Sequence, residues 1–119
     1  MNYCHKAEAP HDGHNLCLKT SMETFQQIIN GDKPVLVDFH ATWCGPCKAM
    51  APELVHFSRQ HSDKLRVIKI DVDKNPQAST AYQVQAVPTL MLFKNGKVVW
   101  RQSGAMSAQQ LGQFISPLL

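Results

Sequence analysis

Long apolar runs are missing from this sequence. No segment is long enough to cross a bilayer, and the first twenty residues lack the apolar stretch of a secretory signal. We therefore expect no membrane partner. The expected location is cytoplasmic, or periplasmic or secreted if a leader has been removed from the mature chain.

Blocks of like charge are missing as well. The net charge of +3 is spread along the chain, which is too weak and too diffuse for a nucleic-acid groove. Cysteine is scarce, because four residues in 119 do not make a disulfide scaffold. The composition, with 44% hydrophobic and 18% charged residues, is that of a folded chain, and its length allows one domain with a modest core.

Apolar runs and amphipathic segments alternate along the chain after residue 15. Thr20 and Glu23 have the spacing of a helix capping box, and so do Ser107 and Gln110. Asn95-Gly96 is a strong signal for a tight hairpin. The order is β-α-β-α-β-α-β-β-α, with strands expected over residues 16–18, 34–40, 65–71, 89–94 and 97–103. This predicts an α/β fold with a mixed five-stranded sheet flanked by four helices, in a domain over 16–119 behind a flexible extension over 1–15.

The segment that carries the most chemistry runs Trp43-Cys44-Gly45-Pro46-Cys47-Lys48, between a strand and a helix. Cysteines three residues apart on a helix are neighbours, and the helix N-terminus favours a thiolate, the attacking species in disulfide exchange. One alternative is a pair of inert core thiols. Another is half of a zinc site, although His56 falls on the opposite helix face from Cys47.

Two charged residues interrupt strands that are otherwise apolar. Asp38 shares a strand face with Leu36 and His40, and burial would raise the pKa of its carboxyl group toward the working range of a general base. Lys69 lies in the next strand and would be a partner for Asp38 if the two strands adjoin. The alternatives are a carboxylate at a strand end and a lysine at an exposed edge.

These residues together resemble the thioredoxin family over residues 16–119. The resemblance rests on five segments in order, which are Val35-Leu36-Val37-Asp38-Phe39, Trp43-Cys44-Gly45-Pro46-Cys47-Lys48, Ile70-Asp71-Val72-Asp73, Val87-Pro88-Thr89-Leu90 and Phe93-Lys94-Asn95-Gly96.

The resemblance implies a protein-disulfide reductase. Cys44 would attack a disulfide in a target protein, and Cys47 would then release the reduced target and close a Cys44–Cys47 disulfide. Asp38, with Lys69 nearby, would accept the proton of Cys47, and Pro88 would be cis and face the sulfurs. The surface that receives the substrate would comprise Trp43, Gly45, Pro46, Val87, Pro88 and Gly104.

The resemblance also implies partners. Electrons would come from NADPH through a flavin-containing thioredoxin reductase, so that no cofactor or metal is bound here. The other partners would be disulfide-containing proteins, and the chain would be a monomer. The same site could instead act as an oxidant or isomerase, or the chain could be a non-catalytic scaffold; Gly-Pro between the cysteines resembles reductases more than oxidants.

Two features depart from the family pattern. His40 stands where the family usually has tryptophan. It could couple to Asp38, alter the packing beneath Cys44, or be a partly exposed spacer. The extension places Cys4-His5 ahead of His11-x-x-His14-x-x-Cys17. This spacing is compatible with a metal site, with a regulatory Cys4–Cys17 disulfide, or with a plain disordered tail followed by Cys17 as a core residue.

Overall fold

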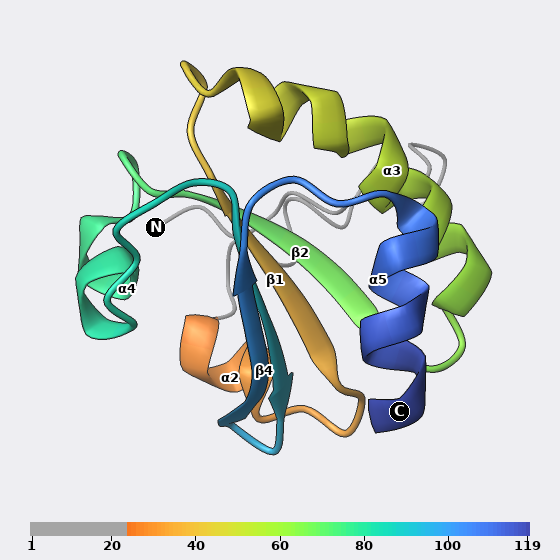
Figure 1. The fold of residues 1–119 in the computed structure, drawn as a ribbon. Coiled ribbons are helices and arrows are strands. Elements are labelled where there is room, and N and C mark those ends of the chain that lie inside the picture. Colours follow the sequence, from red (N-terminus) through yellow and green to blue (C-terminus); the bar gives the residue numbers. More distant parts are fainter. Residues whose placement is uncertain (1–23) are drawn as a thin grey trace, which may run out of the picture.

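The computed structural model describes residues 24–119. A mixed four-stranded sheet occupies the centre of this part of the chain, in the order β2-β1-β3-β4 (Figure 1). β1 runs parallel to β2 and antiparallel to β3, which forms a hairpin with β4. The strands are β1 (Val35–His40), β2 (Arg66–Asp71), β3 (Thr89–Lys94) and β4 (Lys97–Ser103). The helices are α2 (Phe25–Ile29), α3 (Gly45–His61), α4 (Pro76–Ala81), α5 (Ala108–Ile115) and the short 3-10 helix η2 (Ser116–Leu118).

The predicted α/β class and the mixed sheet are confirmed. Four of the five expected strands lie in residues 24–119, whereas the first, over 16–18, falls outside the described residues, as does the extension over 1–15. In the described part of the chain, no helix is apolar over a length sufficient to cross a membrane.

The first described helix, α2, starts later than its sequence signal predicts. Its N-cap is Thr24, whose hydroxyl accepts a hydrogen bond from the backbone N–H of Gln27, and the Gln27 side chain bonds back to the Thr24 backbone. The expected cap, Thr20, lies outside the described residues. Thr24-x-x-Gln27 satisfies the same capping rule as Thr20-x-x-Glu23, so that local sequence alone does not choose between them.

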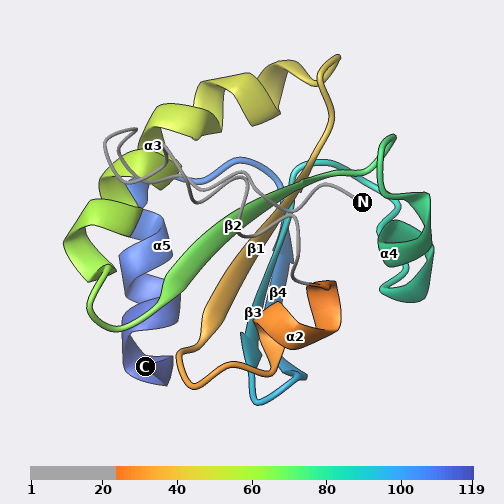
Figure 2. The same cartoon turned by 180° about the vertical axis from the view of Figure 1, so that it is seen from behind.

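Two apolar cores lie on the two faces of the sheet. α3 and α5 cover one face, where Leu36 of β1 packs with Leu54 and Leu111. α2 and α4 cover the other, where Val37 and Phe39 pack (Figures 1 and 2). The alternation along β1 places Asp38 and His40 on the side of α3.

Segments that are distant in sequence meet at one edge of the sheet. β1 and β2 are parallel, so their carboxyl ends share this edge. β3 is antiparallel to β1, and the pairing of Thr89 with Phe39 brings its amino end there. Thr89 also pairs with Ser103, which adds the end of β4. This edge therefore collects the loops that carry the cysteines, Pro88 and Gly104.

Candidate active site

Cys44 and Cys47 form a disulfide at the start of α3. Cys44 is the N-cap: its backbone is extended, and its Sγ accepts a hydrogen bond of 3.1 Å from the backbone N–H of Cys47. Pro46 stands in the first turn, where a helix needs no N–H donor. Both cysteines are about 95% buried, while Gly45 and Pro46 between them are exposed. The pair is thus oxidised, and it is buried next to two residues that are exposed at the surface, Gly45 and Pro46.

The loop that ends in Pro88 faces this disulfide. The Val87–Pro88 bond is cis, as the resemblance implied. The Val87 carbonyl oxygen lies 3.6 Å from Cys44 Sγ. Gly104 adopts a φ of 102°, a left-handed conformation that favours glycine, and its N–H donates to the Pro88 carbonyl at 2.9 Å. Val87, one of the expected surface positions, therefore lies against Cys44, and a backbone hydrogen bond joins the other two, Pro88 and Gly104.

Asp38 lies beneath the surface on β1. Its side chain has no exposure, and neither carboxylate oxygen has a hydrogen-bond partner among the described residues. Burial raises the pKa of Asp38 to about 7, and the positive charge of Lys69 opposes that rise. Lys69 is the register partner of Asp38 on β2, as predicted for adjoining strands. The site thus contains a carboxyl group that can hold or give up a proton near neutral pH.

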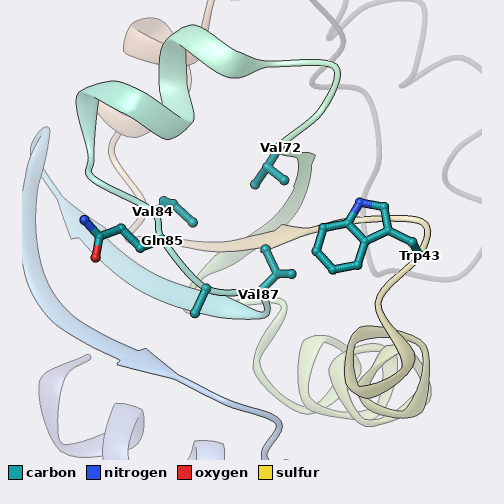
Figure 3. Close-up of a pocket in the computed structure, with 6 residues that line it drawn as sticks. Trp43, Val72, Val84, Gln85 and Val87 are labelled. Carbon is teal, nitrogen blue, oxygen red and sulfur yellow. The ribbon is translucent and has the colours of Figure 1, made fainter.

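Trp43 forms one wall of a hollow beside the disulfide. Its side chain is 69% exposed, and its indole N–H donates to the Asp73 carboxylate at 2.9 Å. Figure 3 shows Val72, Val84 and Val87 gathered with Trp43 around this hollow. The result is an apolar surface next to Cys44, with one aromatic ring held in place.

Sequence reasoning missed three residues of this surface, Val72, Val84 and Asp73. Val72 and Asp73 follow β2 in the sequence. The carboxyl ends of neighbouring parallel strands share one edge of the sheet, so a placement of β2 beside β1 would have been the signal for these two residues. Val84 had no comparable signal, because it belongs to the irregular segment after α4.

Metal-binding alternatives have little support in the described part of the chain. Residues 24–119 contain no group of three or more His, Cys, Asp or Glu side chains placed to hold an ion. The expected candidates Cys4, His5, His11, His14 and Cys17 lie outside the described residues.

Known proteins show clear similarity to this chain. The sequence profile of the Thioredoxin family matches residues 16–117. Thioredoxin of Alicyclobacillus acidocaldarius subsp. acidocaldarius is 47% identical over 95 residues, which is 80% of this chain and 90% of that protein. Thioredoxin of Acidithiobacillus ferridurans is 43% identical over 103 residues, covering 86% and 95% of the two chains. Chloroplastic thioredoxin Y1 of Arabidopsis thaliana is 45% identical over 102 residues, covering 85% of this chain and 59% of that protein.

Proposed function

The chain belongs to the thioredoxin family of protein-disulfide reductases, and we propose that it reduces disulfide bonds in other proteins through Cys44 and Cys47. The observation that carries this proposal is the Cys44–Cys47 disulfide at the N-terminus of α3, with Cys44 Sγ facing the carbonyl of Val87. A helix N-terminus lowers the pKa of a thiol placed there and so supplies the thiolate that exchange requires.

The reaction proceeds in two exchanges. In the reduced protein, the Cys44 thiolate attacks one sulfur of the target disulfide, which forms a mixed disulfide and frees one target thiol. Cys47 then loses its proton to Asp38 and attacks Cys44, so that the Cys44–Cys47 bond forms and the second target sulfur leaves. Two electrons pass from the dithiol to the target.

The substrate docks on the surface around Cys44. Trp43, Val72, Val84 and Val87 provide apolar area, and the exposed Gly45 and Pro46 leave the approach to the sulfurs open. The backbone of Val87 pairs with an extended substrate segment, as in β-strand addition. Pro88 and Gly104 hold this loop in place.

The oxidised protein is returned to the dithiol by a partner. We expect this partner to be a flavin-containing thioredoxin reductase that uses NADPH, with the chain acting as a monomer that binds no cofactor of its own.

Insulin reduction tests the proposal. The full chain with NADPH and a thioredoxin reductase should reduce insulin, and Cys44→Ser should lower turnover to the uncatalysed rate because the attacking sulfur is gone. Cys47→Ser should accumulate a mixed disulfide through Cys44, visible by mass spectrometry. The control carries Cys4→Ser and Cys17→Ser and should keep full turnover. Turnover that persists in Cys44→Ser would contradict the proposed function.

A further inference from the structure

The loop over residues 83–88 forms one wall of the apolar hollow beside Cys44. Residues 84–87 all line this hollow, and Figure 3 shows Val84 and Val87 gathered with Trp43 around it. We call residues 83–88 the docking loop, because the proposed function places the substrate against it. The position of this loop therefore determines how well a substrate fits, and the inference below rests on the proposed function.

The docking loop begins where α4 ends, and its first residue has an unfavourable backbone conformation. Gln83 has a φ of 54°, in the left-handed region that glycine usually occupies after a helix. Its N–H donates to the carbonyl of Thr80 at 3.1 Å, and the N–H of Val84 donates to the carbonyl of Ser79 at 2.9 Å. These two bonds close the helix. Because a glutamine is strained at this φ, surrounding contacts must hold the chain there.

Arg101 of β4 supplies such contacts. Its Nη1 donates to the carbonyl of Tyr82 at 2.6 Å, and its Nη2 donates to the carbonyl of Gln83 at 2.8 Å. Two nitrogens of one planar group thus hold two successive carbonyls, which fixes the direction in which the chain leaves α4. The last turn of α4 has no basic residue of its own, so the guanidinium group also provides the positive charge that a helix C-terminus favours.

The end of β4 holds the other end of the docking loop. The Thr89 hydroxyl group donates to the carbonyl of Ala86 at 2.6 Å and lies 3.0 Å from the Ser103 hydroxyl group. The N–H of Gly104, the residue after β4, donates to the carbonyl of Pro88 at 2.9 Å. The loop is therefore anchored on both sides of the residues that line the hollow, and the guanidinium group is the anchor on the side of α4.

Packing holds α4 in place independently of this guanidinium group. The Tyr82 ring makes edge contacts with the rings of Phe25 and Phe93, at centroid distances of 5.5 and 5.2 Å. Ala78 of α4 is buried in the same apolar core. Arg101 itself is exposed, so its replacement opens no cavity. Loss of the guanidinium group is therefore expected to loosen the docking loop and to leave the fold intact.

We propose that Arg101 positions the docking loop for protein substrates and so determines how tightly they bind. Its two hydrogen bonds keep Val84 and Val87 at the distance from Trp43 at which an apolar substrate side chain fits between them. The substrates concerned are proteins that carry such a side chain next to the reacting disulfide. Small disulfides that contact only Cys44 do not use the hollow. Arg101 acts through the loop and takes no part in the exchange of sulfurs or protons.

Two disulfides of different size separate positioning from chemistry. Hydroxyethyl disulfide is small and uncharged and needs only access to Cys44, whereas insulin must also dock. The reference is the full chain with Cys4→Ser and Cys17→Ser, so that only the active-site pair reacts. The reduced protein is mixed with an excess of each disulfide, and its oxidation is followed by acid quenching, alkylation and mass spectrometry.

We expect Arg101→Gln to lower the second-order rate constant with insulin about tenfold and to leave the constant with hydroxyethyl disulfide within about twofold of the reference. Arg59→Gln is the matched control, since Arg59 is exposed on α3 at a distance in sequence from the docking loop, and it should change neither constant. An unchanged rate with insulin in Arg101→Gln overturns the inference, and so does an equal loss with both disulfides.

Arg101→Lys separates the paired hydrogen bonds from the charge. Lysine keeps a positive charge at the end of α4 but brings one nitrogen in place of two, so this variant should not restore the rate with insulin. Full recovery in Arg101→Lys would show that charge alone is required and would overturn the inference.

Amide hydrogen exchange reports on the docking loop without any substrate. The Val84 N–H, which is bonded to the Ser79 carbonyl, should exchange about tenfold faster in Arg101→Gln, whereas the amides of β1 should exchange as in the reference. Equal exchange at Val84 in the two proteins overturns the inference. Failure of the proposed function looks different, because the reference protein itself would then reduce neither disulfide.

Discussion

Asp38 occupies a position in β1 where its neighbours Val37 and Phe39 are buried and apolar. An ionised carboxyl group there loses its hydration without gaining a hydrogen bond from any described residue. Its pKa is raised to about 7 by burial, with Lys69 opposing the rise, so the folded protein binds this proton more tightly than the unfolded chain does. A group of this kind lowers the stability of the folded protein as the pH rises.

Asp38→Asn should therefore stabilise the protein, and more so at higher pH. The unfolded carboxyl group titrates near pH 4 and the folded one near pH 7, so the wild-type protein loses stability between these values and the loss levels off above pH 7. Between pH 5 and pH 8 the advantage of the variant should grow by about 3 kcal/mol. Urea unfolding at both pH values measures it.

Asp63→Asn is the control for this prediction. Asp63 is exposed in the turn after α3, so its replacement should leave the pH dependence of unfolding unchanged. An equal advantage of Asp38→Asn at pH 5 and pH 8 would show that the folded Asp38 is not the group that titrates near pH 7.

At the scale of the elements, the β3–β4 hairpin is joined to α2 through its turn. Asn95 and Gly96 both have positive φ, as expected for a two-residue hairpin turn with Asn-Gly. The N–H of Gly96 donates to the carbonyl of Ile29 at the end of α2. A Cβ at position 96 would collide with the Asn30 side chain. The glycine therefore serves the turn and also the close approach of the helix.

Gly96→Ala should destabilise the protein by about 1–3 kcal/mol, because alanine is strained at a φ of 81° and the Asn30 side chain must move. Gly112→Ala makes the same chemical change inside α5, where a Cβ meets nothing within 4 Å. It should stabilise by about 0.5–1 kcal/mol. Urea unfolding at one pH compares both variants with the wild-type protein, and a neutral Gly96→Ala would contradict this account of the turn.

At the scale of the whole molecule, the site is built from the ends of four strands and the start of one helix. Every residue assigned a role in it lies between Asp38 and Gly104. The family profile begins at residue 16, which leaves the first fifteen residues outside the matched domain.

Removal of residues 1–15 should therefore leave catalysis intact. We expect insulin turnover within about twofold of the full chain and an unchanged Cys44–Cys47 redox potential, because every residue to which we assign a role in the exchange lies after residue 37. Equilibration against glutathione measures the potential. A shifted potential in the shortened chain would show that Cys4 or the histidines of the extension act on the site.

Local signals predicted much of the fold because they depend on neighbouring residues alone. The Asn95-Gly96 turn places β3 and β4 over the residues expected, and the capping box of Ser107 and Gln110 starts α5. The capping signal failed at α2, where Thr20 and Thr24 offer equivalent caps. In the structure, α2 begins after Thr24, and its residues Phe25 and Ile28 are buried against the sheet.

The sequence by itself determined the residue types on which the proposed chemistry depends: two cysteines at a helix start, an acid in an apolar strand and a lysine in the next. These features follow from residue type and short spacing, which the chain carries before it folds. The tertiary structure alone decided which distant residues join them. Val84 lines one hollow with Trp43, and His40 and Lys69 line another with Cys47. These residues come together because the ends of β1, β2, β3 and β4 meet at one edge of the sheet.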